Sequence, residues 1–135
     1  MTYVLDTNAV SALMKGSAAV VERLAATERA GVAVPQPVLA EIAFGIERLP
    51  RSKRRTALQA RFDLISAELP RAEWTDGVSQ VYGRIKASLE RRGTRIEDFD
   101  AAIAAHALAL GATLVTANLG HMMRVPGLRV EDWSS

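Results

Sequence analysis

Short β-rich apolar runs alternate with segments of helical spacing along nearly the whole chain. The runs at 3–5 and 32–34 are typical of strands buried on both faces, and those at 112–116 and 128–130 have a similar character. Helical sequence follows each of the first two runs, and a helix predicted at 98–110 precedes the third. Parallel strands need such crossover helices, so the pattern predicts an α/β fold with helices on both faces of a parallel sheet.

The rest of the chain is expected to belong to the same unit. Residues 64–69, LISAEL, fit a further strand, and residues 74–93 fit a long helix that ends at Gly93. A chain of 135 residues with 49% hydrophobic side chains can bury one core, and neither a linker nor a repeat divides it. We therefore expect a single domain over residues 1–135.

Composition indicates the cellular compartment in which the protein functions. The absence of cysteine excludes disulfides and thiolate metal sites, and it fits a reducing cytoplasm. The N-terminus lacks the pattern of a secretory signal, and the longest apolar run falls short of the ~20 residues that span a bilayer. We expect a cytoplasmic protein without membrane contact.

Polar residues stand where the predicted strands end. Asp6 directly follows the first strand, Glu41 lies one turn into the helix after the second, and Asn118 lies just beyond the strand at 112–116. In parallel α/β folds, ligands bind outside the carboxyl ends of the strands. Each residue taken alone also fits a structural role, because Asp and Asn make turns and caps, and a Glu near a helix start interacts favourably with the helix dipole.

The helix predicted at 98–110 separates two acids. At about 100° per residue, Asp100 lies on the same apolar stripe as Ile103 and Ala107, while Asp98 points roughly the opposite way. Asp98 is therefore the better helix cap. An inward carboxylate such as Asp100 needs a cation, a network of donors or a raised pKa, because an unpaired buried charge is unfavourable.

Three carboxylates and one amide from different strand-to-helix junctions are expected to converge in a small volume. Oxygen ligands without Cys or a well-placed His suit Mg²⁺ or Mn²⁺. Ions held by carboxylates commonly act on phosphates, and the arginine-rich segments at 51–61 and 84–95 fit either a polyanion or a solvated helix face. The pattern indicates a nucleic-acid phosphodiester as substrate, with Asp6 at the metal and Thr7 and Asn8 left to turn and cap the chain.

Four stretches resemble one known family. They are VLDTN with Asp6, AEIAFGIERL with Glu41, DAAIAAHALALGATLVTAN with Asp100 and Asn118, and the closing VPGLRVEDW. In this order and spacing, over nearly the whole chain, they resemble a PIN-domain ribonuclease, specifically a VapC-type toxin of bacterial toxin–antitoxin pairs.

The resemblance implies a three-layer α/β/α sandwich and an endoribonuclease that uses Mg²⁺ or Mn²⁺ to cut RNA with an activated water. It also implies a homodimer and a small antitoxin as protein partner. Carried over by position, Asp6, Glu41 and Asp100 are metal ligands and, with Asn118, form the catalytic set. Asn118 stands where some PIN domains have a fourth acid, and a neutral amide contributes less to holding a second ion.

Several residues near these motifs have more than one interpretation. HMM replaces the family's usual acidic-aromatic pair, and its His121 fits a surface loop better than a substrate contact. Asp98 departs from the family pattern. The basic segment 51–61 lies where such toxins have a helical arm, and it fits binding of either RNA or antitoxin. Trp74 and Trp133 are interpreted as packing or interface residues.

Two other functions fit parts of the pattern. A phosphatase or phosphotransferase of another doubly wound fold would phosphorylate Asp6, although Asn8 replaces the second Asp usual in that signature. A non-catalytic nucleic-acid-binding module would use the acids only as helix caps. A phosphorylated Asp6 would identify the first, and a lack of stabilisation by Mg²⁺ would identify the second.

Overall fold

Five strands form one parallel sheet in the computed structural model, which describes residues 2–134. They are β1 (Tyr3–Leu5), β2 (Val32–Pro35), β3 (Arg71–Ala72), β4 (Thr113–Val115) and β5 (Arg129–Glu131). Their order across the sheet is β3, β2, β1, β4, β5. After β1, the chain adds β2 and then β3 on one side of that strand. It later returns to add β4 and β5 on the other side of β1, so the direction in which strands are added reverses between β1 and β4. Ligand sites of parallel sheets lie at such switch points.

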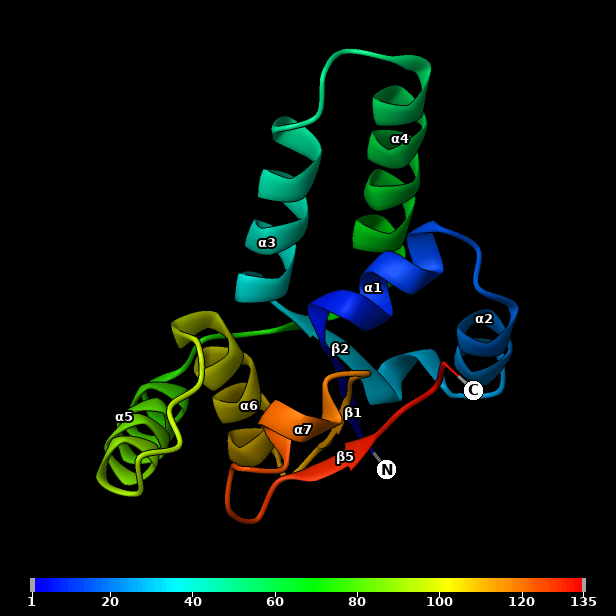
Figure 1. The fold of residues 1–135 in the computed structure, drawn as a ribbon. Helices are drawn as coiled ribbons and strands as arrows, with labels where there is room; N and C mark the ends of the chain where they lie inside the picture. Colours follow the sequence, from blue (N-terminus) through cyan, green and yellow to red (C-terminus); the bar gives the residue numbers. More distant parts are fainter. Residues whose placement is uncertain (1, 135) are drawn as a thin grey trace.

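Helices cover both faces of the sheet, which confirms the predicted α/β/α layering. α5 (Asp76–Arg91) and α6 (Asp98–Leu110) pack together on one face, and α1 (Thr7–Met14) and α2 (Ala18–Ala25) lie on the other (Figure 1). α3 (Gln36–Glu47) and α4 (Lys53–Glu68) stand side by side and project away from the sheet, and the short α7 (Leu119–Met122) follows β4 (Figure 1). In the part of the chain that the structure describes, no helix combines the length and apolar character needed to cross a membrane.

α6 is buried on almost every side, and its sequence explains why. All residues from Ala101 to Ala107 are buried, and most of them are alanines, whose small side chains let neighbouring elements approach closely. The helix has the predicted bounds of 98–110. Gly111 ends it with a φ of +64°, a left-handed conformation that glycine adopts without the steric strain of a side chain.

The strand predicted at 64–69 is wrong, because α4 continues through most of it. Leu58, Phe62 and Ile65 recur at helical spacing and pack against the core, whereas a strand would turn alternate residues inward. The basic segment at 51–61 lies largely in this helix, so the predicted helical arm is confirmed. The strand that follows is the two-residue β3.

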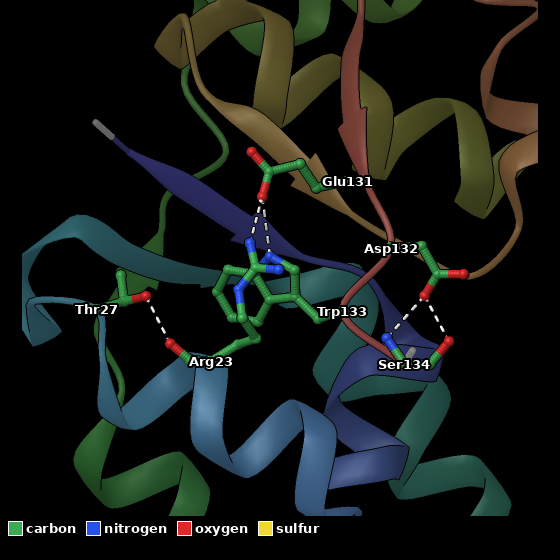
Figure 2. A network of polar contacts seen from close by, with 6 residues as sticks. All are labelled: Arg23, Thr27, Glu131, Asp132, Trp133 and Ser134. Carbon is green, nitrogen blue, oxygen red and sulfur yellow. Dashed lines mark hydrogen bonds and ion pairs between the residues drawn. The ribbon is translucent and has the colours of Figure 1, made fainter.

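Polar and aromatic contacts connect β5 and the residues that follow it to α2 (Figure 2). Arg23 of α2 donates to Glu131 Oε1 at 2.9 Å, and the indole N–H of Trp133 donates to the same oxygen at 3.0 Å. The Arg23 guanidinium lies over the Trp133 ring, 5.3 Å from its centroid, and Tyr3 meets that ring edge-on. Trp133 is 2% exposed, so its predicted packing role is confirmed.

Trp74 is packed less completely. Its ring centroid lies 6.0 Å from that of Tyr82 and 5.2 Å from that of His106, and its indole N–H donates to Ser79. The residue is nevertheless 46% exposed. Trp74 thus packs against α5 and α6 on one side and leaves the other side at the surface.

Candidate active site

The four residues singled out from the sequence line one open pocket of about 460 Å³. Asp6 follows β1, Glu41 lies on α3 after β2, Asp100 lies near the start of α6, and Asn118 follows β4. Since β1 pairs with both β2 and β4, the carboxyl ends of the three strands meet at one edge of the sheet. The predicted convergence of these four side chains is confirmed.

Asp6 is held in place by three donors. Its Oδ1 accepts from the Thr7 backbone N–H at 2.7 Å, and its Oδ2 accepts from the Thr116 hydroxyl at 2.7 Å and from the Asn8 amide at 3.4 Å. Asp6 is only 2% exposed. Burial raises its pKa, while the hydrogen bonds from Thr116, Thr7 and Asn8 act in the opposite direction.

Asp6 is itself the N-cap of α1, so the prediction that Thr7 and Asn8 take over capping is wrong. The reason is geometric. Residue 6 has extended backbone, and one of its carboxylate oxygens reaches the N–H of the next residue while the side chain still lines the pocket. Capping and pocket lining are therefore not alternatives at this position.

Thr7 connects two of the acids. Its backbone N–H binds Asp6, and its hydroxyl donates to Glu41 Oε1 at 2.5 Å. Glu41 comes from α3 and Thr7 from α1, so this hydrogen bond links two helices across the pocket. Sequence reasoning assigned Thr7 only a turning and capping role, and the one available signal for this contact was its position directly after Asp6.

Asn8 and Thr116 tie the loop after β1 to the loop after β4. Asn8 Oδ1 accepts from the Ala117 N–H at 2.8 Å, and its amide donates to the Thr116 hydroxyl at 3.3 Å. That hydroxyl also accepts from the Asn118 N–H at 2.9 Å. Thr116 thus holds both Asp6 and the backbone of Asn118. Sequence reasoning did not single out Thr116.

Asp100 has the most perturbed ionisation of the acids in the pocket. Burial, together with the negative charges of Asp6 and Glu41, raises its pKa from 3.8 to about 6, and the charge of His121 acts in the opposite direction. The inward orientation predicted for this side chain is consistent with that shift. A carboxylate in this position favours a cation that would offset the negative charge around it.

Asp98 and His121 lie outside the pocket lining. The N-cap of α6 is Glu97, so the cap predicted at Asp98 is wrong. Asp98 is the first helical residue and pairs with Lys86 Nζ at 2.6 Å, which lowers the pKa of Asp98. His121 is exposed on α7, with Nδ1 3.2 Å from the Asn118 amide nitrogen. It stands closer to the site than the predicted surface loop implied.

The donor chemistry of the pocket suits a hard cation. Asp6, Glu41 and Asp100 supply carboxylate oxygens, and the pKa of Asp100 is raised first by burial and then by the negative charges of Asp6 and Glu41. Within residues 2–134, no three His, Cys, Asp or Glu side chains lie close enough to enclose a metal ion. The carboxylates thus share one pocket without forming a closed cage.

The fold and the pocket together define the general class of this protein. It is a parallel α/β protein with a carboxylate-lined pocket at the ends of its strands. The model of the PIN domain family matches residues 3–127, and the chain belongs to that family. It is 33% identical to "Ribonuclease VapC2" of Rickettsia felis, over 98% of each chain. It is 30% identical to the "tRNA(fMet)-specific endonuclease VapC" of Shigella flexneri, over 99% of each.

Solved structures agree with this family membership. One is VapBC2 of Rickettsia felis bound to a promoter DNA fragment, with a TM-score of 0.85 and 31% identity over 98% of this chain and 99% of that one. Another is DNA-bound VapBC of Salmonella typhimurium, with a TM-score of 0.88 and 28% identity over 98% of each chain. The predicted resemblance to VapC-type PIN domains is confirmed.

Proposed function

We propose that this protein is a Mg²⁺-dependent endoribonuclease and the toxin of a toxin–antitoxin pair. The observation that carries this proposal is the pocket itself, in which Asp6, Glu41 and Asp100 lie together at the carboxyl edge of the sheet. The similarity to ribonucleases named VapC over nearly the whole chain supports it. The substrate is a phosphodiester of single-stranded or looped RNA.

Asp6 and Asp100 are the main ligands for Mg²⁺ or Mn²⁺, and Glu41 completes the set. When bound, the ion offsets charge on the phosphate oxygens and activates a water for in-line attack on phosphorus. Hydrolysis forms a bond from the water oxygen to phosphorus and breaks the bond to the leaving sugar oxygen. Asn118 adds a neutral donor and acceptor at the pocket's edge, where it leaves the charge of the site unchanged.

The surrounding residues fix the acids in position. Thr116 and the Thr7 N–H hold Asp6 in one orientation, which reduces the side-chain freedom that Asp6 would lose when an ion binds. The Thr7 hydroxyl holds Glu41, which orients the attacking water. Because the donors come from α1 and the loop after β4, the folded sheet edge orients both Asp6 and Glu41.

A small antitoxin is the proposed protein partner. Several solved structures similar to this chain are VapBC complexes, and two of them contain DNA. The projecting α3–α4 pair, with the basic segment 51–61, offers a surface beside the pocket for either the antitoxin or RNA (Figure 1). A homodimer and a cytoplasmic location complete the proposal.

The phosphotransferase alternative receives no support from the geometry of Asp6. Asn8 stands where that signature has its second Asp, and its amide donates to Asp6 Oδ2 at 3.4 Å instead of supplying a second carboxylate. Incubation of the protein with a phosphate mimic should therefore leave Asp6 unmodified.

Induced expression in a bacterial host tests the proposed function. We expect the wild-type protein to arrest growth and to create new RNA 5′ ends, and Asp100→Asn to do neither while reaching the same soluble level. Growth arrest without new 5′ ends would show that the protein acts by some other means. New ends produced equally by Asp100→Asn would remove this pocket as the site.

A further inference from the structure

The pocket has a cationic end as well as an acidic one. Its lining includes Lys15, which directly follows α1, together with Ser11 and Ala12 of that helix. Thr7, Ser11 and Lys15 are spaced four residues apart and therefore share one face of α1. At 1.5 Å per residue, this face extends about 12 Å from the acids at the start of α1 to Lys15 at its end.

Lys15 has no polar partner within residues 2–134. Among the described residues its ammonium takes part in no hydrogen bond and no ion pair, and the side chain is exposed. In particular, it does not pair with the three carboxylates that line the same pocket. A lysine that served to neutralise those acids would be paired with one of them, so this charge is free for an external anion.

A second positive charge lies at the same end of α1. Arg61 of α4 donates from Nη1 to the Met14 carbonyl at 2.8 Å, which places its guanidinium next to the residue that precedes Lys15. The arginine thereby satisfies a carbonyl at the negative end of the α1 dipole. Arg61 and Lys15 therefore place two positive charges at this end of α1, an arrangement that favours an anion.

Between the two ends, the side chains on this face of α1 are small. Ser11 and Ala12 line the pocket and leave it open to solvent along the helix. A polyanionic strand laid along this face would meet the acids and their metal at one end and a free cation at the other. This spacing suits a chain of regularly placed phosphates better than a compact anion.

We propose that Lys15 binds a backbone phosphate neighbouring the one that is cut, so that the RNA strand lies along the Thr7, Ser11 and Lys15 face of α1. This inference rests on the proposed ribonuclease function. Lys15 is then a substrate-binding residue that contributes to RNA affinity and register, and it takes no part in the chemical step. Contacts of this kind weaken steeply with salt and are independent of sequence.

RNA binding by proteins carrying Asp100→Asn tests the inference without cleavage. The probe is a fluorescein-labelled single-stranded RNA of mixed sequence, and its Kd is measured by anisotropy in Mg²⁺ at several salt concentrations. Adding Lys15→Met should weaken binding roughly fivefold at low salt and reduce the slope of log Kd against log salt by about 0.7, the loss expected for one phosphate contact. Lys15→Arg should keep the parent slope.

Arg29→Met is the matched control, because it also removes one exposed positive charge but lies just before β2, at the amino end of that strand and outside the lining of this pocket. It should leave both the Kd and the slope unchanged. An unchanged slope in Lys15→Met, an equal loss in Arg29→Met, or no RNA binding by the parent would each overturn the inference.

Gels of wild-type protein with the same RNA report separately on the proposed function. Cleavage by the wild type with an unchanged Lys15→Met slope leaves the ribonuclease proposal standing and removes Lys15 from the site. In steady state, Lys15→Met should raise KM and leave kcat nearly unchanged, since the contact is made equally in the ground and transition states.

Discussion

Asp6 combines two demands in one carboxylate. It caps α1 through the Thr7 N–H and presents its charge to the pocket, although burial makes that charge unfavourable. Asp100 carries a similar penalty on α6. At both positions the site holds negative charge that a fold selected for stability alone would avoid, as is common where binding or catalysis requires it.

Asp100→Asn should stabilise the metal-free protein at pH 8. A pKa raised from 3.8 to about 6 means that the folded state binds the proton more tightly than the unfolded state, so ionisation above pH 6 destabilises the fold. Because an amide removes this penalty, we expect the free energy of unfolding to rise by about 1 kcal/mol at pH 8. The gain should fade as the pH falls from about 6 to 3.8, as measured by urea unfolding in EDTA.

Asp98→Asn is the control from the same helix, and its pH dependence should have the opposite sign. The pKa of Asp98 is lowered by Lys86, so its charge adds a little stability above pH 3.8, and that contribution is lost as the pH falls. A small loss at pH 8 is therefore expected. A stabilisation of equal size in the two variants would show that the effect of Asp100→Asn is not specific to the pocket.

Thr116→Val should disturb the site from a position that carries no charge. It removes the hydroxyl that donates to Asp6 and accepts from the Asn118 N–H, which leaves Asp6 Oδ2 with only the longer hydrogen bond from Asn8 and the Asn118 N–H without this acceptor. We expect a loss of about 1 to 2 kcal/mol in the free energy of unfolding, together with a fall in kcat. Thr116→Ser keeps the hydroxyl and should restore most of both. If valine and serine behaved alike, the hydroxyl would have no positioning role.

At the scale of elements, the sequence predicted α6 with the bounds that the structure has. It wrongly assigned the C-terminal end of α4 to a strand. In α6, a continuous run of small and apolar residues ends at Gly111. The helical spacing of the run and the helix-ending glycine therefore predict the same C-terminus for the helix. In α4, the six residues 64–69 look apolar enough for a strand, and the helical period becomes visible only when Leu58 and Phe62 are included. A short window therefore loses the information that distinguishes a helix from a strand.

Two glycine substitutions should shift stability in opposite directions. Gly111→Ala places a side chain at a φ of +64° and should lower the free energy of unfolding by about 1 kcal/mol. Gly45→Ala, inside α3 with nothing within 4 Å of the added carbon, should raise it by about 0.5 to 1 kcal/mol. Thermal melts of the two variants measure both effects, and equal signs would contradict the assigned backbone conformations.

At the scale of the whole molecule, the predicted parallel sheet indicated which side chains meet, but not how they are held. Asp6, Glu41 and Asn118 follow from their positions at strand ends, and Asp100 follows from its place on the apolar stripe of its helix. The hydrogen bonds that fix them join residues 34 and 110 positions apart, Thr7 with Glu41 and Thr116 with Asp6. No local pattern contains such pairs, because they depend on how the strands align in the folded sheet.

Mg²⁺ should stabilise the folded protein as a whole. An ion that binds only the folded state adds roughly 2.7 kcal/mol at 100 times its Kd. We expect the wild-type melting temperature to rise with Mg²⁺ or Mn²⁺ and to be largely insensitive to these ions in Asp100→Asn. No shift in the wild type would favour a module whose acids serve only as caps.

Cleavage of a 5′-labelled RNA by the purified protein tests the central claim most directly, with wild type, Asp100→Asn and Asp98→Asn compared in Mg²⁺ and in EDTA. We expect the wild type and Asp98→Asn to cleave at the same rate in Mg²⁺ and not in EDTA, and Asp100→Asn to be slower by at least about 100-fold. Full Mg²⁺-dependent cleavage by Asp100→Asn, or wild-type cleavage that persists in EDTA, would contradict the assignment of this pocket as a metal-dependent ribonuclease site.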